Sequence, residues 1–383
     1  MSPPDKAWNG IGAQLDRVTG SLETSATLPP ACYTDDAVFA REHERIFRTS
    51  WVGIGRADRW QATGDYVALT VGGAPIIVVR DKHGDLGAFA NSCRHRGTQL
   101  LVGAGNCRRI QCPFHSWTYA LDGRLIAAPR MDRAVGFEMA DYGLVAFRAA
   151  VADGFAFVCL DPATPELDEW LGDFSQRHAP WGLDRLVATR RREFDIACNW
   201  KMVLEVFNEY YHLPYVHADS FGDIYQEPDA PDPASGNYAT QFGATQGTGG
   251  LTRDTQDQSL PPIAGLEGRN RQGTRYSWMF PTMTFAAGIE AIWVYEAHPV
   301  APDRTRAALT VCFPPETVAR ADFEDRAAHY YDRFDTALAE DIAILERQQA
   351  GLSSPYAMPG RFADLEPSVA SFAHWYAGKM RAS

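Results

Sequence analysis

Two short segments of the sequence each pair a cysteine with a histidine, and together they constrain the fold more than any other feature. The segments are Cys93-Arg-His95 and Cys112-Pro-Phe-His115. Two thiolates and two imidazoles can serve one metal centre only if the two segments fold next to each other. Such a set suits either a structural zinc or a two-iron cluster with cysteines on one iron and histidines on the other. Zinc fingers pair Cys with Cys and His with His, whereas these two segments alternate the ligand types.

Short β-branched runs separated by glycine turns surround these segments. Runs at 66–71 and 75–80 are followed by a turn that contains His83, and further strands are expected over 145–160. This pattern predicts a small antiparallel sheet domain, with His83 as a solvated loop residue. Residues 161–165, Asp-Pro-Ala-Thr-Pro, read as a linker. We therefore predict an N-terminal segment (1–47, with a helix near 37–47) that packs on a later domain, a first domain (48–160) and a second domain (161–383).

The segment 199–217 gathers ionisable residues in a helical pattern. In a helix, Glu205, Glu209 and His212 share one stripe at i, i+4 and i+7. His217 would point about 140° away from His212 in an unbroken helix. Pro214 cannot continue the hydrogen-bond ladder, so a break there could bring the two imidazoles together. Converging histidines beside acids suggest a metal.

A late helix, predicted for about 322–351, carries a carboxylate on its apolar face. Its apolar stripe contains Phe334, Leu338, Leu345 and Leu352, and Asp341 falls inside it. A buried carboxylate is costly unless it is paired or metal-bound, so a buried salt bridge or a helix cap is the alternative. The neighbours Glu340, Glu346 and Arg347 are predicted to lie on other faces. Together with His212 and His217, Asp341 would complete the two-histidine, one-carboxylate set that binds Fe(II) and leaves positions open for oxygen.

With these motifs in hand, the whole chain resembles the oxygenase component of Rieske non-haem iron oxygenases. The resemblance implies an α+β chain, with an all-β Rieske [2Fe-2S] domain followed by a helix-grip (START-like) catalytic domain that has an antiparallel sheet and a long C-terminal helix. It implies that Cys93 and Cys112 hold one cluster iron and His95 and His115 the other. His212, His217 and Asp341 would hold the mononuclear iron.

Two positions distinguish the chain within that family. Glu209 stands where these enzymes carry an acid that bridges the metal centres of neighbouring subunits, and glutamate there resembles the quaternary-ammonium branch, typified by carnitine monooxygenase and glycine-betaine demethylase. Ser116 stands where a glycine or alanine is more frequent, which bears on the cluster potential.

The resemblance also implies electron donors and an assembly. Electrons would pass from the cluster to the mononuclear iron, where O2 is reduced, and a homotrimer would place one cluster beside the next subunit's iron. The sequence has neither a dinucleotide-binding GxGxxG loop nor a plant-type ferredoxin cysteine run. A separate flavin/iron-sulfur reductase that oxidises NAD(P)H is therefore expected, and monooxygenation is favoured.

The substrate is expected to be a small molecule recognised by aromatic side chains. Tyr276, Trp278 and Phe280 are predicted to share one strand face and Trp293 and Tyr295 another, with Phe207 nearby. Such a cluster could cage a methylated ammonium by cation–π attraction, or it could be sheet core. We expect hydroxylation or oxidative N-demethylation of a betaine-like compound. The alternatives are hydroxylation or O-demethylation of an aromatic acid, and a non-enzymatic Rieske electron carrier or zinc-stapled binding module.

Composition excludes other classes. The net charge is −12 without a Lys/Arg block, which argues against a nucleic-acid partner. The N-terminus has no signal-like apolar core, and no apolar run reaches membrane-spanning length, so a cytoplasmic protein without a membrane segment is expected. Five of the seven cysteines have no pairing pattern and are interpreted as core residues or idle thiols: Cys32, Cys107, Cys159, Cys198 and Cys312. A Gly/Asp/Pro/Gln-rich stretch at 223–275 is expected to be a cover or loop-rich insert.

Overall fold

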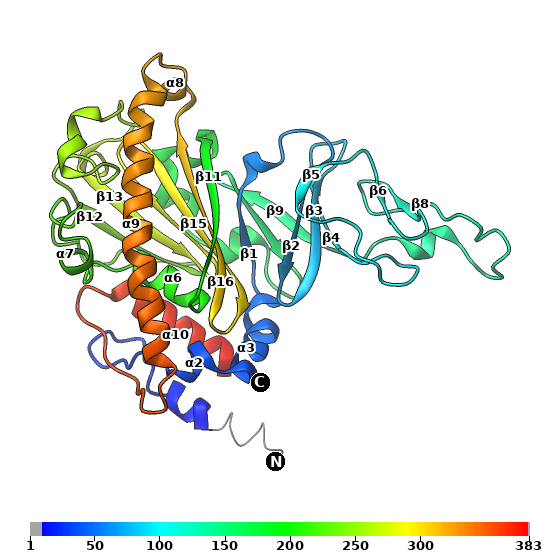
Figure 1. Cartoon of the computed structure of the whole chain (residues 1–383), viewed down its shortest axis with the longest axis horizontal. Helices are drawn as coiled ribbons and strands as arrows, with labels where there is room; N and C mark the ends of the chain where they lie inside the picture. The colour runs from blue at the N-terminus through cyan, green and yellow to red at the C-terminus, as the bar shows by residue number, and fades with distance from the viewer. Residues whose placement is uncertain (1–9, 382–383) are drawn as a thin grey trace.

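The computed structural model describes residues 10–381, so the prediction about the extreme N-terminus lies outside the described residues. Two antiparallel sheets organise the molecule, and they lie side by side along its long axis (Figure 1). The expected α+β architecture, with an all-β part, a second sheet and a long helix late in the chain, is confirmed. Among residues 10–381 no helix combines the length and apolar character needed to cross a bilayer.

The first sheet has seven strands in the order β1-β10-β9-β4-β3-β2-β5, each antiparallel to its neighbours. Its strands are β1 (Val52–Arg56), β2 (Asp65–Val71), β3 (Ala74–Arg80), β4 (Leu86–Ala90), β5 (Ala104–Asn106), β9 (Ala146–Ala152) and β10 (Phe155–Cys159). A small sheet of β6 (Ile110–Gln111), β7 (Thr118–Tyr119) and β8 (Leu125–Ala127) extends from one end. The strands predicted at 66–71, 75–80 and within 145–160 are confirmed, and His83 is exposed in its turn.

The second sheet has six strands in the order β11-β16-β15-β14-β13-β12. They are β11 (Val187–Ile196), β12 (Tyr238–Ala244), β13 (Gly273–Met279), β14 (Met283–Ala287), β15 (Ile292–Ala301) and β16 (Arg304–Phe313). Strand β12 corrects the prediction that 223–275 is only a loop-rich cover. Its sequence includes Gln241 and Gly243, which weaken a strand pattern, but pairing with β13 and burial on both faces override that weak propensity.

Helices cover the second sheet. The longest, α9 (Phe323–Leu352), crosses in front of it in Figure 1 and matches the predicted helix at 322–351. The last helix is α10 (Pro367–Arg381), with basic Lys379 and Arg381 in its final turn, where cations are favourable. Besides short 3-10 turns, the described chain also forms α2 (Ala31–Thr34), α3 (Asp36–Glu42), the π-helix η1 (His43–Phe47), α4 (Leu167–Leu171), α5 (Phe174–His178), α6 (Trp200–Phe207), α7 (Leu213–Val216) and α8 (Pro315–Val318).

The segment 199–217 is two helices with a turn between them, not one helix broken at Pro214. Asn199 caps α6 by accepting a hydrogen bond from the Lys201 N–H. Asn208 ends it, because its side-chain amide donates to the Leu204 carbonyl at 2.6 Å while its Oδ1 accepts from Thr284. Pro214 lies in the first turn of α7, where its missing N–H does no harm. The turn, rather than the proline, folds the chain back.

A buried ion pair ties the N-terminal helices to α6. The Nζ of Lys201 lies 2.6 Å from Oε1 of Glu42, and neither side chain is exposed. Trp200 Nε1–H and Tyr376 O–H also donate to the Glu42 carboxylate, so its buried charge is fully hydrogen-bonded. Residues on α3, α6 and α10 therefore form one unit behind the site described next.

Candidate metal centres

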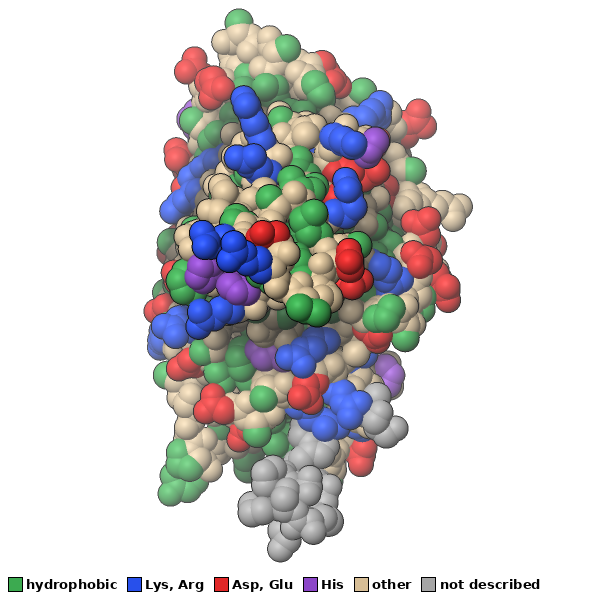
Figure 2. All heavy atoms as spheres, turned by 90° about the vertical axis from the view of Figure 1, so that its right-hand side faces the viewer, with side chains coloured by type: hydrophobic (Ala, Val, Ile, Leu, Met, Phe, Trp, Pro, Cys, Tyr) green, Lys and Arg blue, Asp and Glu red, His purple; other side chains and the backbone are tan. Residues whose placement is uncertain are grey.

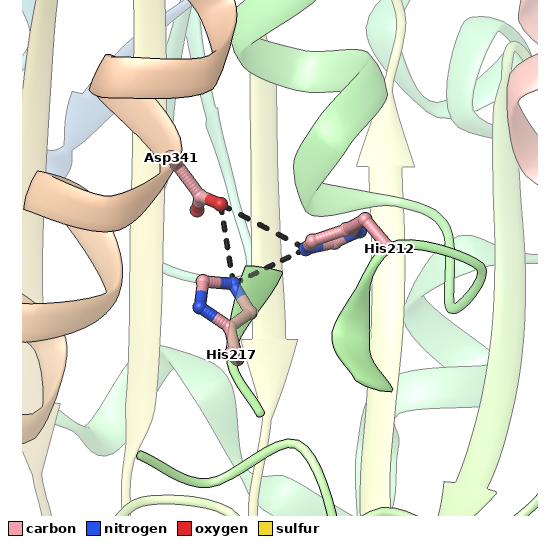
Figure 3. Close-up of side chains that lie close together, drawn as sticks. All are labelled: His212, His217 and Asp341. Atoms are coloured by element: carbon pink, nitrogen blue, oxygen red, sulfur yellow. Dashed lines mark hydrogen bonds and ion pairs between the residues drawn. The ribbon is translucent and has the colours of Figure 1, made fainter. Parts of the chain in front are cut away.

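Three side chains from two regions of the chain converge at the base of α7. His212 immediately precedes α7, His217 ends it, and Asp341 projects from the middle of α9 (Figure 3). The two Nε2 atoms are 3.2 Å apart. Oδ1 of Asp341 lies 3.1 Å from Nε2 of His217 and 3.8 Å from Nε2 of His212. One ligand atom from each residue falls within 4.8 Å of the other two.

Each histidine is oriented by a carboxylate on its other ring nitrogen. Nδ1 of His212 lies 2.5 Å from Oε1 of Glu209, and Nδ1 of His217 lies 2.6 Å from Oε2 of Glu340. Burial lowers the pKa of His212, but the hydrogen bond and charge of Glu209 outweigh it, so the net shift is upward. With Nδ1–H donating to a carboxylate, each Nε2 presents its lone pair toward Asp341.

The donor set fits a metal ion. Oδ1 of Asp341 is buried and has no hydrogen-bond donor among the described residues, although two imidazole nitrogens face it. Three electron-pair donors at contact distance in a buried site repel one another unless a cation lies between them. Two neutral imidazoles and one carboxylate form the facial set that suits non-haem Fe(II).

A narrow cavity opens beside these ligands and is lined by aromatic rings. Phe207, Tyr276, Trp293 and Tyr295 line it together with the three ligand residues. The strand register explains the grouping, because Tyr276 pairs with Ala286 on β14, which pairs with Trp293 on β15. The small alanine between the two rings leaves space. The ring of Phe207 approaches those of Tyr295 and Tyr276, with centroid distances of 4.7 Å and 5.2 Å.

Two predicted pocket residues lie elsewhere, which corrects that prediction. Trp278 stacks on Phe372 of α10 with ring centroids 4.0 Å apart, and Phe280 contacts the same ring at 5.3 Å. The sequence placed Tyr276, Trp278 and Phe280 on one face, but different helices cover that face along its length. The cavity ends at Tyr276, and α10 covers the other two. A larger groove of about 850 Å³ beside α10 is lined by Phe280 and none of the three ligand residues.

The second ligand set lies on two loops at the far end of the first sheet. Cys93 and Cys112 are buried, at 3% and 2% exposure, whereas His95 and His115 are exposed. The two imidazole rings are neighbours, with centroids 4.9 Å apart, and His95 stacks on Trp117. The two thiols are buried, and the two neighbouring imidazoles are exposed. This separation matches a two-iron cluster in which the cysteines bind one iron and the histidines bind the other.

The loops that carry Cys93 and Cys112 have the same backbone hydrogen-bond pattern. The N–H of Cys93 donates to the Thr98 carbonyl and that of Gly97 to the Cys93 carbonyl. The second loop repeats both bonds, from Cys112 to Trp117 and from Ser116 to Cys112. The fifth residue of each loop has positive φ, which is 77° for Gly97 and 57° for Ser116. Ser116 therefore occupies a left-handed position that favours glycine.

Tyr119 supports the first loop from behind. Its hydroxyl lies 3.3 Å from Sγ of Cys93 and accepts a hydrogen bond from the N–H of Arg94. Burial raises the pKa of Tyr119, so this hydroxyl keeps its proton and can donate to a thiolate. Sequence reasoning did not single out this residue.

The remaining cysteines belong to neither ligand set, although Cys107 packs against the apolar cluster that contains Cys93 and Cys112. Burial raises the pKa of Cys32, Cys198 and Cys312 to about 12, so these thiols stay protonated. Cys159 is buried, and Cys107 is partly exposed with a pKa that burial raises. None of the seven forms a disulfide in the described residues.

The end of the molecule that carries His95 and His115 is basic. Figure 2 looks at this end and shows histidine side chains bordered by Lys and Arg side chains. Arg94 and Arg96 of the first loop are both exposed, and Arg96 lies over the exposed ring of Phe114. This end combines positive charge with an exposed aromatic ring, although the chain as a whole is acidic.

Two residues at the buried site were missed. Glu340 was predicted to lie outside the apolar stripe of α9, yet its carboxylate is hydrogen-bonded to Nδ1 of His217. Arg333 lines the cavity and is 4% exposed. It lies eight residues before Asp341, so the two share one helix face. The sequence could have indicated this residue, because Arg333 is a second charge about two turns from that carboxylate.

Comparisons with known families match both parts of the chain. Residues 183–382 match the family model described as the ring hydroxylating alpha subunit (catalytic domain), and residues 50–146 match the Rieske [2Fe-2S] domain. The first match covers more than half of the chain. This chain belongs to the ring-hydroxylating alpha-subunit family.

Individual relatives of this alpha subunit are similar along nearly its whole length. The glycine betaine monooxygenase oxygenase subunit of Chromohalobacter salexigens is 27% identical over 92% of this chain and 86% of its own. The choline monooxygenase, chloroplastic, of Arabidopsis thaliana is 28% identical over 92% and 82%. The crystal structure of the quaternary ammonium Rieske monooxygenase CntA with substrate gamma-butyrobetaine superposes with a TM-score of 0.76, at 25% identity and 99% coverage of both chains.

Family membership establishes the cofactors and the reaction type. The alpha subunit is a Rieske non-haem iron monooxygenase that uses a [2Fe-2S] cluster, a mononuclear iron and O2. It is an oxygenase component that receives electrons from a separate reductase and acts on a small molecule. The interpretations as a bare electron carrier or a zinc-stapled module are therefore wrong.

Proposed function

We propose that this alpha subunit oxidises an N-methyl group of a small betaine-like compound at the iron held by His212, His217 and Asp341. The observation that carries the proposal is the aromatic cavity beside these ligands, because aromatic faces attract a methylated ammonium. The glycine betaine and choline monooxygenases support it, because both relatives act on trimethylammonium compounds.

The metal assignments are part of this proposal. Cys93 and Cys112 would bind one cluster iron and His95 and His115 the other, in the 48–160 domain. The facial set would bind the mononuclear iron in the 161–383 domain, with residues 1–47 packed behind it. When bound, the iron supplies the oxidising chemistry. The chain's own part is to orient the ligands and substrate and to limit water.

The surrounding residues have separate roles. Glu209 and Glu340 hold the imidazoles in one tautomer, with both Nε2 atoms directed at one point. Phe207, Trp293 and Tyr295 bring an ammonium methyl toward that point and keep bulk water away. Each cation–π contact contributes about 0.5–2 kcal/mol, which is enough for a few rings to set orientation.

The overall reaction balances with the cofactors of the family. One oxygen atom of O2 enters a C–H bond of the N-methyl group, and the other is reduced to water by two electrons from the reductase and two protons. The product N–CH2OH group then breaks its C–N bond, which releases formaldehyde, a proton and a dimethylamino compound. Hydroxylation and demethylation are thus one oxidation followed by a spontaneous cleavage.

A matched pair of compounds tests the cation part of the proposal. Glycine betaine and 3,3-dimethylbutyrate have the same shape and carboxylate, but only the first carries a positive charge. Reconstituted enzyme with a reductase should consume O2 and release formaldehyde with glycine betaine, and should use 3,3-dimethylbutyrate at least about 10-fold less efficiently. Equal efficiency for the two compounds would contradict recognition of the cation.

We further propose a homotrimer in which the cluster of one subunit serves the iron of the next. The loops with His95 and His115 and the base of α7 lie toward opposite ends of the chain's long axis, which supports transfer between subunits (Figure 1). Glu209 would bridge the two centres. The basic end of Figure 2 would approach the neighbouring subunit, while a flavin/iron-sulfur reductase that oxidises NAD(P)H supplies the electrons. A cytoplasmic location suits such a donor.

Mixed oligomers test this arrangement. Cys112→Ser removes a cluster ligand, and Asp341→Ala removes an iron ligand, so each variant alone should be inactive. Coexpressed in equal amounts, they should recover about a quarter of wild-type activity per chain, because one subunit in four is iron-competent beside a cluster-competent neighbour. No recovery in a mixed trimer, or an active monomer in analytical ultracentrifugation, would refute transfer between subunits.

A further inference from the structure

Arg333 places a buried positive charge in the wall of the cavity that holds the iron ligands. It lies on α9, two turns before Asp341, and the intervening Ala337 leaves space between them. Only 4% of the residue is exposed. Arginine stays protonated in proteins, so this charge persists at any pH at which the enzyme works.

The guanidinium has aromatic neighbours but, among the described residues, no anionic partner. Its Cζ lies 3.7 Å from the ring centroid of Phe221, 5.6 Å from that of Trp293 and 5.3 Å from that of Phe334. The one hydrogen bond found for it runs from Nη2 to the hydroxyl of Tyr225 at 3.3 Å, and Nε is buried without a partner. No carboxylate lies within ion-pair distance of it among residues 10–381, and the carboxylate on its own helix face, Asp341, is directed at the histidines.

Two other buried arginines, Arg275 and Arg56, also leave Nε without a partner in the described part of the chain, but their terminal nitrogens have more polar partners than those of Arg333. Arg275, also 4% exposed, forms an ion pair with Asp232 at 2.5 Å. Arg56, like Arg333, has no carboxylate partner among the described residues, but it donates from both terminal nitrogens to backbone carbonyls and lines none of the cavities described above. A buried charge without an ionic partner is costly, so an arginine kept in this state at a cavity wall indicates an anion that arrives with the substrate.

Phe221 fixes the position of this charge relative to the metal ligands. Cζ of Arg333 lies 3.7 Å from the centroid of the Phe221 ring, and His217 stacks on the same ring with centroids 4.3 Å apart. The guanidinium is thus one aromatic ring away from an iron ligand. A substrate that reaches both points would carry its anionic group only a few bonds from the carbon that is oxidised.

We propose that Arg333 binds the carboxylate of the substrate and thereby selects zwitterionic betaines over cationic alcohols such as choline. This inference rests on the proposed function and narrows its substrate class. Phe207, Trp293 and Tyr295 attract the ammonium end, and Arg333 attracts the carboxylate end. A substrate with the ammonium alone would leave Arg333 unpaired and place two positive charges in one cavity.

The experiment compares wild type, Arg333→Gln and Arg333→Lys with glycine betaine, choline and 3,3-dimethylbutyrate as probes. Arg347→Gln is the matched control, because Arg347 is an exposed arginine on the same helix. Iron content and cluster absorption are measured for every variant, and the Kd of each probe is measured by calorimetry alongside kcat and KM.

We expect wild type to bind glycine betaine at least about 10-fold more tightly than choline. Arg333→Gln should weaken glycine betaine and 3,3-dimethylbutyrate by about 10- to 100-fold, mainly in KM, and should not weaken choline. Arg333→Lys should recover part of the loss, and Arg347→Gln should match wild type. A structural role alone would weaken all three probes together.

The outcomes separate this inference from the proposed function. If wild type uses choline as well as glycine betaine, or if Arg333→Gln affects both equally, the inference is refuted while N-methyl oxidation stands. If wild type oxidises 3,3-dimethylbutyrate as well as glycine betaine and this requires Arg333, the carboxylate site stands and recognition of the cation is refuted.

Discussion

Nδ1 of His217 lies 2.6 Å from Oε2 of Glu340, the residue that immediately precedes Asp341 on α9. One turn of helix therefore supplies both the carboxylate that faces the metal position and the carboxylate that orients a histidine ligand. Ser220 Oγ–H donates to the same Glu340 oxygen at 3.0 Å and holds it in place. A shift of α9 would move both carboxylates together.

Glu340→Ala should weaken retention of the mononuclear iron by about 10- to 100-fold, because His217 loses the acceptor that fixes its tautomer. The measurement is iron per chain after dialysis against a chelator, with cluster absorption recorded in parallel. Asp332→Ala, an exposed acid on the same helix, is the control. Unchanged iron retention in Glu340→Ala would show that the hydrogen bond does not support the ligand.

Tyr119→Phe should lower the reduction potential of the cluster. The hydroxyl beside Sγ of Cys93 stabilises the extra negative charge of the reduced state, and a hydrogen bond of about 1 kcal/mol corresponds to roughly 40 mV for one electron. Redox titration monitored by EPR gives the value. A potential equal to that of wild type would mean that the Cys93 sulfur gains nothing from this contact.

Ser116→Gly should stabilise the second cluster loop by about 1 kcal/mol, because glycine adopts φ of 57° without the steric penalty of a Cβ. The rate at which cluster absorption is lost on heating should fall. Ser116→Ala keeps the Cβ and should lose its cluster as fast as wild type. Equal rates for glycine and serine would show that this loop opens after the cluster is lost.

Glu205 should make the stability of the protein fall as pH rises. Burial raises the pKa of Glu205 to about 7 from its usual 4.5, even though Tyr33 donates a hydrogen bond to it. The folded chain therefore holds this proton more tightly than the unfolded chain, and stability is lost from about pH 4.5 to pH 7. The loss is at most about 3 kcal/mol.

Glu205→Gln keeps the acceptor for Tyr33 and removes the titration. The melting temperature of the variant should be close to that of wild type at pH 5 and higher than wild type at pH 8. A gap that stays constant across this range would contradict the raised pKa.

The sequence predicted those features whose residue pattern is contained within a short stretch of the chain. Residue spacing alone predicted the Cys-His loops, the apolar stripe of α9 and the strands β2 and β3. Asp341 could be predicted for the same reason, because a carboxylate within an apolar stripe is inconsistent with the residues around it. The sequence predicted that His212 and His217 approach each other, but it attributed the chain reversal to a helix break at Pro214. In the structure Asn208 ends α6, and Pro214 lies in the first turn of α7.

The sequence did not predict features that depend on how helices and strands pack against each other. Tyr276 and Trp278 share a strand face, yet α10 covers one of them and the cavity adjoins the other. Tyr119 and Glu340 act on residues that are distant in sequence, so nothing in their own neighbourhood marks them. The strand β12 is held by its partner β13 rather than by its own composition.

The most direct test of the central claim is iron per chain, with absorption and EPR spectra of dithionite-reduced protein, for wild type and Asp341→Ala. The wild type should contain about three irons with a Rieske-type signal, and the variant about two with that signal unchanged, because the two ligand sets are separate. Zinc in place of the cluster, or equal iron in both proteins, would contradict the proposed assignment of the two centres.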